Sequence, residues 1–325
     1  MQGLTRGLFA GAVFAGAFIM ALPSSGLAQG FPAKPIRLIV NLPPGTAADL
    51  VARTLAPKMS ESMNQPVLVE NRPGATGYIG LDAVVKSAPD GYTVVHTSGS
   101  TIAINPHLYK SSFDTLKDLD PIAPTMRTTI ILVVRADSPI KNVADLVAQA
   151  RANPGKLNYG SSGAGSGMHI ATEMMMRSAK IQATHIPYKG SSDTLASLLA
   201  GTLAFTFDPG VALPHIKAGK LRIIGVARGT RSPLYSDTPT MAEAGADANA
   251  DVVFGIYGAA GTPKDIVARL NREIVRGMQS KEVATTLSTL AAELVTGSPE
   301  EFAEQQRRDR DRYGVFGREA GIKAE

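Results

Sequence analysis

Four glycines and three serines crowd the stretch from Asn158 to His169, between a short apolar segment and a helical pattern. A strand that runs through such a loop into a helix exposes free backbone N–H groups at the positive end of the helix dipole. That arrangement is an anion site made largely of backbone. A second loop of similar design, Pro43 to Asp49, lies far upstream, also between a strand and a helix. We expect the two loops to face each other across a cleft and to hold a carboxylate.

The unit of strand, loop and helix repeats along the chain. Continuous apolar segments predict parallel strands at 36–40, 67–70 and 92–96, and a second series begins at 130–135. This repetition predicts an α/β fold in which doubly wound sheets are flanked by helices. Later strands are expected at 185–186, 203–207, 221–226 and 252–258. Helices are expected at 51–63, with a kink at Pro57, and at 81–88, 143–152, 168–177, 194–200 and 213–218.

The N-terminus has the form of a secretory signal peptide. Arg6 precedes the apolar run from Leu8 to Leu22, and the small residues Gly26 to Ala28 suit a cleavage site. We expect residues 1–28 to be removed and the remainder to be a soluble protein of the periplasm. The length, 325 residues, indicates two domains. Cysteine is absent, so the sequence offers no disulfide, no thiolate ligand for a metal and no acceptor for a lipid anchor.

The formal charge of +5 could suggest nucleic acid or a membrane as partner. The charges are mixed in sign, and the densest group, Arg307 to Arg312, alternates arginine with aspartate on an expected helix. We interpret that group as a solvated helix face and expect no nucleic-acid partner. A mild positive field favours a small anion. Start signals predict two C-terminal helices: Thr262 before Pro263, and a capping box at 298–301.

Other site types fit the sequence poorly. The glycines at 74–80 and 160–167 do not match the dinucleotide fingerprint, and the chain has no phosphate-loop lysine motif. None of Ser161, Ser162 and Ser166 has a glycine at both flanking positions of a nucleophile elbow. The five histidines show no metal-ligand spacing, and we expect His169 to face solvent or the cleft rim. We therefore predict no metal, no cofactor and no catalytic centre.

Several stretches together resemble one family, the periplasmic solute receptors of tripartite tricarboxylate transporters (the Bug/TctC family). The resemblance covers essentially the whole mature chain in order. The matching stretches are Pro43-Pro44-Gly45 with Asp49, Val69 to Ala75 with Gly77 and Gly80, Ala88 to Tyr92, Asn105-Pro106 with Leu108-Tyr109, Asn158 to Gly165 with His169, Ile186 to Gly190, Pro214 to Leu221, Pro239-Thr240 with Glu243 to Gly245, and Ala260 to Pro263.

The resemblance implies a two-lobed Venus-flytrap fold with the ligand between the lobes. Lobe one would be residues 29–128 together with 251–325, and lobe two residues 129–250. The ligand would be a small organic carboxylate, and the partner a membrane permease that receives it from a monomeric receptor. The positions that correspond to the family's cleft are Pro44, Gly45, Thr46, Ala47, Asp49, Ala75, Thr76, Gly77, Ser98, Ser100, Ser161, Ser162, Gly163, Ser166, His169, Tyr188 and Asp208.

Two positions depart from the family pattern. Thr46 stands where a second glycine is usual, and Ala48 lies near a usual serine or threonine. Both changes alter the first half of the expected carboxylate clasp. Two other functions stay open at this point. The closed receptor could signal to a sensor kinase, or the chain could be an exported hydrolase that uses Ser161 or Ser162.

Overall fold

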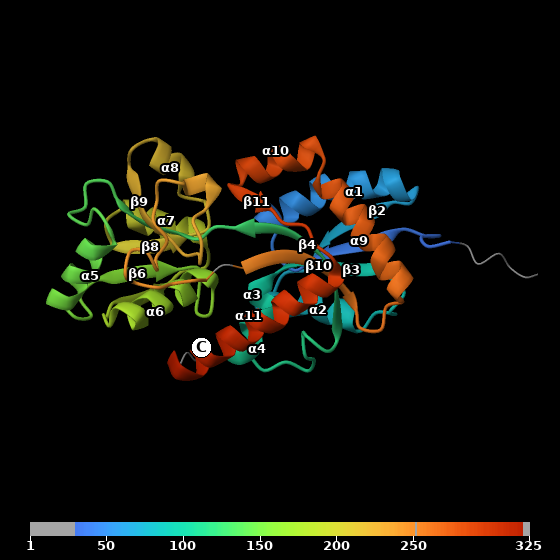
Figure 1. The fold of residues 1–325 in the computed structure, drawn as a ribbon, viewed down its shortest axis with the longest axis horizontal. Helices are drawn as coiled ribbons and strands as arrows, with labels where there is room; N and C mark the ends of the chain where they lie inside the picture. Colours follow the sequence, from blue (N-terminus) through green and yellow to red (C-terminus); the bar gives the residue numbers. More distant parts are fainter. Residues whose placement is uncertain (1–29, 251, 321–325) are drawn as a thin grey trace, which may run out of the picture. The chain divides into compact units, whose positions relative to one another are not determined.

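Two mixed sheets carry the fold, and helices flank each of them (Figure 1). The computed structural model describes residues 30–250 and 252–320, so the predicted signal peptide lies outside the described residues. From Pro32 onward the chain forms one compact unit. None of the helices in the described ranges combines the length and the apolar character that a membrane crossing requires. We call the first sheet with its helices lobe one, and the second sheet with its helices lobe two.

The first sheet has six strands in the order β11-β4-β10-β3-β1-β2. Only β1 pairs in parallel on both sides, with β2 and with β3, whereas β10 and β11 join through antiparallel pairs. The sheet is therefore assembled from both ends of the chain. Its strands are β1 (Ile36–Val40), β2 (Val67–Asn71), β3 (Thr93–Ser98), β4 (Leu119–Thr128), β10 (Val252–Ala259) and β11 (Ala292–Leu294).

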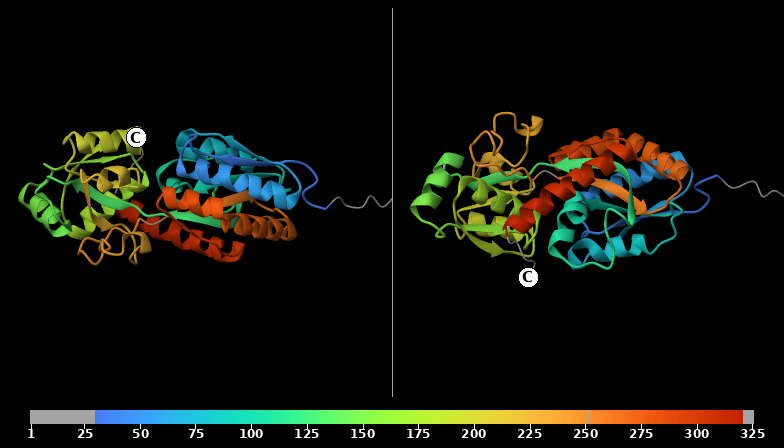
Figure 2. Two further views of the ribbon diagram at one scale, coloured as in Figure 1. Left: turned by 90° about the horizontal axis from the view of Figure 1, so that it is seen from above. Right: turned by 60° about the horizontal axis from the view of Figure 1, so that its bottom comes forward.

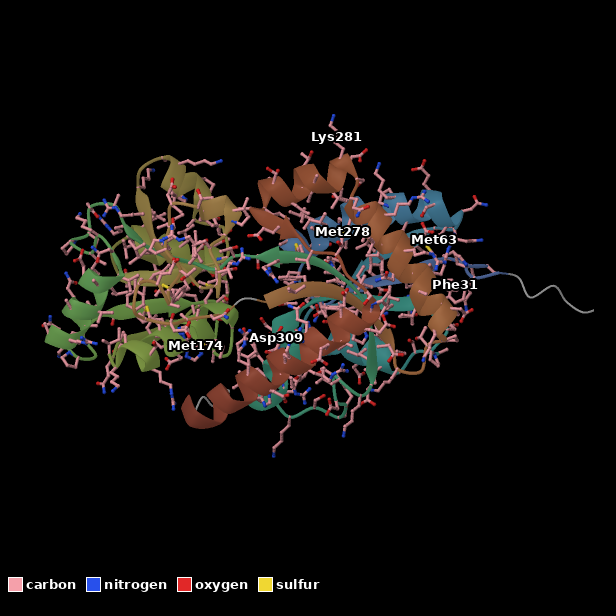
Figure 3. All side chains as sticks on the ribbon, viewed as in Figure 1. Phe31, Met63, Met174, Met278, Lys281 and Asp309 are labelled. Carbon is pink, nitrogen blue, oxygen red and sulfur yellow. The ribbon has the colours of Figure 1, made fainter. Side chains whose placement is uncertain are left out.

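Helices from the C-terminal part of the chain, orange to red in Figure 2, cover much of the first sheet. The helices α9 and α11 pack on β4, and α1 packs on α9 and α10. Met278 at the end of α9 is fully buried, whereas Lys281 at the start of α10 points away from the lobe (Figure 3). The helices of lobe one are α1 (Ala47–Met63), α2 (Tyr78–Val85), α3 (Gly99–Ala103), α4 (Asn105–Leu108), α9 (Lys264–Met278), α10 (Lys281–Thr289) and α11 (Pro299–Ala320), with a short 3-10 turn η1 (Ala75–Gly77).

The second sheet has five strands in the order β7-β6-β8-β5-β9. Here β6 pairs in parallel with β7 and β8, and β5 pairs antiparallel with β8 and β9. Tyr159, Phe205 and Met175 are fully buried in the core between this sheet and its helices. The elements are β5 (Ile131–Arg135), α5 (Val143–Ala152), β6 (Asn158–Ser161), α6 (Gly167–Ala179), β7 (Thr184–Pro187), α7 (Ser191–Leu199), β8 (Phe205–Asp208), α8 (Leu213–Lys217), β9 (Leu221–Val226) and η2 (Pro233–Tyr235).

Each sheet has one strand, β1 or β6, that carries parallel neighbours on both sides. In open α/β sheets, ligands bind outside the carboxyl end of such a strand, where the strand order reverses. The loop from Pro43 to Thr46 leaves β1 at this place, and the Gly/Ser loop leaves β6 at the equivalent place. The predicted α/β class with two helix-flanked sheets is confirmed. The lobe boundaries at residues 128–129 and 250–251 stay a prediction.

Several elements differ from their predicted bounds. The helix α7 begins at Ser191 instead of residue 194, and α2 begins at Tyr78 instead of residue 81. The strand β4, which contains Pro121 and Pro124, was not predicted. Pro57 lies inside α1, which continues to Met63.

The two predicted helix starts near the C-terminus have different outcomes. The capping box is confirmed: Ser298 N donates to a Glu301 carboxylate oxygen at 2.9 Å, and Glu301 N donates to Ser298 Oγ at 3.1 Å. The cap at Thr262 is wrong, because its hydroxyl donates to Ala259 O and the helix starts after Pro263.

Candidate functional site

Hydrogen bonds from nearby side chains fix the conformation of the loop before α1. Thr46 is the N-cap residue in extended conformation, and its hydroxyl donates to Pro43 O at 2.8 Å. Gly45 donates its N–H to Asp49 Oδ2 at 2.9 Å. Pro44 is exposed in the same loop. The first N–H groups of a helix have no partner within the helix, so the start of α1 keeps its capacity to bind an anion.

Asp49 acts as the brace of this loop. Its side chain is buried, pairs with Arg53 at 2.9 Å and accepts from Asn71 Nδ2 at 2.8 Å. Burial opposes ionisation, but the hydrogen bonds from Gly45, Arg53 and Asn71 outweigh it and hold the pKa of Asp49 below its ordinary value. Asp49 is therefore an ionised structural residue whose charge is already compensated.

A cavity of about 430 Å³ opens at the start of α1. Gly45, Thr46 and Ala47 line it from lobe one. Lobe two contributes Ser191 and Ser192 at the start of α7 and the turn that follows β8. The complete lining is Leu42, Gly45, Thr46, Ala47, Ala48, Thr128, Ser191, Ser192, Pro209, Gly210, Val211, Phe254, Thr289 and Leu290. The cavity thus joins the first predicted loop to the start of α7, which was not among the predicted site residues.

The start of α7 lies beside the start of α6. Ser191 Oγ donates to the sulfur of Met168, which is the second residue of α6, at 3.5 Å. Tyr188 N donates to Ser161 O at 2.9 Å, and this bond joins the segment before α7 to the segment before α6. Both helix starts therefore present N–H groups at the same edge of the second sheet.

The Gly/Ser loop itself contacts lobe one. Gly163 and Gly165 have φ angles of +115° and +74°, which only glycine adopts without strain. Ser166 is the N-cap of α6 and accepts from His169 N at 3.3 Å. Tyr109 Oη, directly after α4, donates to Ala164 O at 3.0 Å. The loop is thus turned by its glycines, capped by Ser166 and fastened across the lobes by Tyr109.

His169 is buried, and the expectation that it faces solvent or the cleft rim is wrong. Its Nδ1 accepts the N–H of Gly165 at 3.0 Å, and its ring stacks on the ring of His185 with centroids 4.2 Å apart. Its Nε2 lies 3.6 Å from a carboxylate oxygen of Glu173. Glu173 also accepts from Tyr159 Oη at 2.6 Å. Burial alone would raise the pKa of Glu173, but its bonds to His169 and Tyr159 hold that pKa below the ordinary value. His169 therefore stabilises the Gly/Ser loop through its hydrogen bond with Gly165.

One pair of groups has the geometry of a hydrolase dyad. His185 Nε2 lies 2.7 Å from Ser161 Oγ, a pairing that the sequence did not indicate. Ser161 is fully buried, however, and its hydroxyl also lies 3.0 Å from Gly163 O. Burial, aided by the neighbouring His169, lowers the pKa of His185 to about 4, which makes it a weak base at neutral pH. The pair is a partly buried hydrogen bond inside lobe two.

The other predicted residues of lobe one occupy two tight turns. Ala75, Thr76 and Gly77 all have positive φ angles, and Asn105 Nδ2 donates to Thr76 O at 3.0 Å. Asn41 Nδ2 donates to Gly77 O at 3.1 Å. In the second turn, Ser98 caps the short helix α3 by accepting from Ser100 N. These turns follow β2 and β3, the strands that flank β1, at the carboxyl edge of the sheet.

Asp208 organises the lobe-two wall of the cavity. Its Oδ1 accepts from Gly210 N at 2.7 Å and from Ala212 N at 2.9 Å. Its Oδ2 is buried and has no partner among the described residues. Burial raises the pKa of Asp208, although the backbone N–H groups oppose the shift. Tyr188 packs against the apolar cluster to which β5, α7 and β9 contribute.

Sequence reasoning missed the lobe-two lining of the cavity. Ser191, Ser192 and Val211 were not predicted, although Gly190-Ser191-Ser192 repeats the Gly/Ser signal at a strand end. Placing the helix start at residue 194 hid them. No group of three or more His, Asp or Glu side chains suited to a metal ion occurs within the described ranges.

Comparison with known proteins gives one consistent result. The model of the family described as "Tripartite tricarboxylate transporter family receptor" matches residues 51–321. Protein BugT of Bordetella pertussis is 34% identical over 327 residues, which cover 99% of each chain. A protein from a Pseudomonas strain is also 34% identical and covers 93% of this chain and 91% of its own.

Solved structures agree on the fold. An R. palustris protein solved with adipate is 31% identical, has a TM-score of 0.80 and covers 91% of this chain and all of its own. MatC from Rhodopseudomonas palustris, solved with bound malate, is 27% identical with a TM-score of 0.76, and the match covers 88% and 99% of the two chains. The family is one of receptors rather than enzymes. Two helix-flanked sheets, a cavity at helix starts and the match to the family model together place the chain in the receptor family of the tripartite tricarboxylate transporters.

Proposed function

We propose that the protein is a periplasmic receptor that binds a small organic carboxylate in the cavity between α1 and α7. The observation that carries the proposal is that two helix starts, one from each lobe, open into one cavity. Each start contributes partial positive charge and free N–H groups to the same space. Relatives solved with adipate and with malate support a carboxylate as the ligand class.

The proposed contacts begin with the residues that line the cavity. Gly45, Thr46 and Ala47 supply backbone N–H groups and one hydroxyl from lobe one. Ser191 and Ser192 supply the opposing contacts. The remaining predicted positions, including the loop from Ser161 to Ser166, are not among the residues that line this cavity, and they stay predictions.

Binding would favour closure, because a carboxylate held by both lobes gains contacts that an open state lacks. A ligand shifts a conformational equilibrium only by its difference in affinity for the two states. We propose that a membrane permease recognises the closed form and accepts the carboxylate from it. Uptake of the ligand should then require both the permease and this receptor.

A panel of organic acids tests the proposed function. The melting temperature of the purified mature chain, from residue 29 onward, is measured with acids, sugars and amines at equal concentrations. Bound ligand stabilises the folded state by mass action, so at least one carboxylate should raise the melting temperature. Native mass spectrometry of protein purified without added ligand should reveal a co-purified acid. A melting temperature that rises with sugars or amines but with none of the carboxylates would contradict the proposal.

A further inference from the structure

One peptide group of the Gly/Ser loop is bound on both sides, by a buried histidine of lobe two and by a tyrosine of lobe one. Its N–H, from Gly165, donates to Nδ1 of His169 at 3.0 Å. Its carbonyl oxygen, from Ala164, accepts from Tyr109 Oη at 3.0 Å. Leu108 of α4 approaches Gly165 so closely that an added Cβ would lie 2.5 Å from its Cδ1. The peptide between Ala164 and Gly165 therefore links His169 to lobe one.

This arrangement requires that Nδ1 of His169 carry no proton. A backbone N–H can only donate, so Nδ1 is the acceptor and the proton of the neutral ring lies on Nε2. Nε2 is 3.6 Å from a carboxylate oxygen of Glu173, which would compensate the charge of an imidazolium. A proton on Nδ1 would set two donors against each other, and Gly165 N would lose its acceptor.

The peptide group responds as a rigid unit, because it is planar and its N–H and C=O point in opposite directions. When the N–H of Gly165 turns away from His169, the C=O of Ala164 turns away from Tyr109. Gly165 allows this rotation, since glycine adopts either sign of φ. We propose that protonation of His169 rotates this peptide and breaks its bond to Tyr109, so that the lobes separate more readily in acid. The inference does not depend on which ligand the cavity binds.

The proton would act as a ligand that prefers the separated lobes. With the lobes joined through Tyr109, Nδ1 is occupied by the N–H of Gly165. After the peptide has rotated, Nδ1 is free to take a proton. A ligand shifts a conformational equilibrium by its difference in affinity for the two states, so a falling pH favours separation.

The titratable groups that contact His169 lie on α6, β7 and β6. Burial opposes ionisation of Glu173, but its hydrogen bonds to His169 and Tyr159 hold its pKa below the ordinary value, so it stays ionised near neutral pH. Burial lowers the pKa of the stacked His185 to about 4, so this ring stays neutral. Burial also raises the pKa of Tyr159, which keeps its proton.

Titratable groups also come from the other elements around the loop and α6. Burial raises the pKa of Tyr109, so its hydroxyl stays a donor. The strand β8 carries Asp208, whose Oδ1 is bound by the N–H groups of Gly210 and Ala212. The helix α11 carries Tyr313, which belongs to the apolar cluster of α6. Above pH 5.5, His169 is thus the ring whose protonation would change the bonding of the loop.

The distance between the lobes tests the inference directly. The chain has no cysteine, so Lys281→Cys on lobe one and Lys220→Cys on lobe two, both exposed, accept spin labels cleanly. Distances are measured on ligand-free protein at pH 8.0 and 5.5, on either side of the ordinary imidazole pKa of about 6.5. The ratio of separated to joined lobes should rise about five- to tenfold at pH 5.5, since one hydrogen bond between the lobes is lost.

Three variants assign the effect to its groups. His169→Gln offers an oxygen to Gly165 N but does not titrate, so its distances should be the same at both pH values. Tyr109→Phe removes the donor to Ala164 O, so its lobes should be separated at pH 8.0 as well, with little further change in acid. His215→Gln is the matched control, because this histidine lies on α8, and it should keep the pH response of the parent.

A second readout needs no variant at His169. In ¹⁵N spectra of the parent, one imidazole should change from the Nε2-protonated neutral form to the charged form between the two pH values, together with the change in distance. A ring that becomes charged while the distances stay constant would overturn the inference. So would a response of His169→Gln or Tyr109→Phe equal to that of the parent. These measurements use no ligand, so their failure leaves the proposed function standing, and failure of every carboxylate to bind leaves this inference standing.

Discussion

Nδ1 of His96 lies 2.9 Å from the carbonyl oxygen of Ala48, so a buried ring on β3 holds the start of α1. The opposite nitrogen lies 2.9 Å from Thr125 Oγ on β4. The hydroxyl of Thr125 is in turn 3.0 Å from Phe254 O. This chain of contacts links both lobe-one walls of the cavity, Ala48 and Phe254, through one histidine. The carbonyl oxygen of Ala48 can only accept, so Nδ1 of His96 is the donor in that contact.

Acid should destabilise the protein through this ring. Burial lowers the pKa of His96 to about 4, against an ordinary value of about 6.5. The His96 ring therefore binds a proton more readily in the unfolded chain than in the folded protein. Its contribution to stability is full above about pH 6.5 and is lost as the pH falls toward 4. The loss should be roughly 3 kcal/mol, since each unit of pKa corresponds to about 1.4 kcal/mol. Urea unfolding at pH 7.5, 5.5 and 4.5 measures it.

The variant His96→Gln identifies the source of that pH dependence. It should be less stable than the parent at pH 7.5 and should lose less stability on acidification. Some dependence should persist, because burial also lowers the pKa of His185 to about 4. An unchanged slope in His96→Gln would contradict the assignment to this residue.

Loss of the Asp49 carboxylate should loosen the loop before α1. Asp49→Ala removes the acceptor for Gly45 N and leaves Arg53 and Asn71 without it. We expect a loss of about 1–3 kcal/mol in the free energy of unfolding and weaker binding of carboxylates. Asp82→Ala is the control, because Asp82 forms only an exposed ion pair with Lys86 one helical turn away. That control should change stability by less than about 0.5 kcal/mol.

Substitution of Gly77 should destabilise the protein more than its backbone angle alone implies. Its φ of +95° already disfavours a side chain, and an added Cβ would overlap Nδ2 of Asn41. Gly219 has a similar φ of +69° with no atom within 4 Å of an added Cβ. Gly219→Ala should therefore cost about 1–2 kcal/mol from the backbone alone, and Gly77→Ala should cost more. Equal losses in chemical denaturation would show that the contact with Asn41 relaxes freely.

The buried ion pair between Arg228 and Glu293 should couple the two lobes. Arg228 follows β9 in lobe two, Glu293 lies on β11 in lobe one, and Ser232 donates to the same Glu293 oxygen at 2.8 Å. Glu293→Ala should cost about 1–3 kcal/mol, because it removes the charged acceptor of the hydrogen bonds from Arg228 and Ser232.

A double-mutant cycle with Arg228→Met should show that the double variant loses less stability than the sum of the single variants. The exposed pair Arg231–Glu243 serves as the comparison, with an expected coupling of about 1 kcal/mol or less. Additive losses at Arg228 and Glu293 would mean that the pair carries no coupling between the lobes.

Local patterns in the sequence were sufficient for much of the fold. The capping box at Ser298 and Glu301 forms as predicted, because both of its hydrogen bonds join residues three apart. The Gly/Ser loop lies between a strand and a helix as expected, since its glycines adopt angles that other residues avoid. Apolar runs in the sequence identified the strands β1, β5 and β9. All of these features were predictable because each is decided by residues that are neighbours in the chain.

Contacts between distant residues decided the rest. No strand was predicted at β4, which contains Pro121 and Pro124 beside irregularities in its register with β10. The sequence also left His169 on the cleft rim, whereas packing against His185 buries it. Ser191 reaches the cavity because α7 begins three residues earlier than its pattern indicates. The sequence by itself thus determined the fold class and the first loop of the site. Tertiary structure alone decided which helix start opposes that loop, because the opposition depends on packing between residues far apart in the chain.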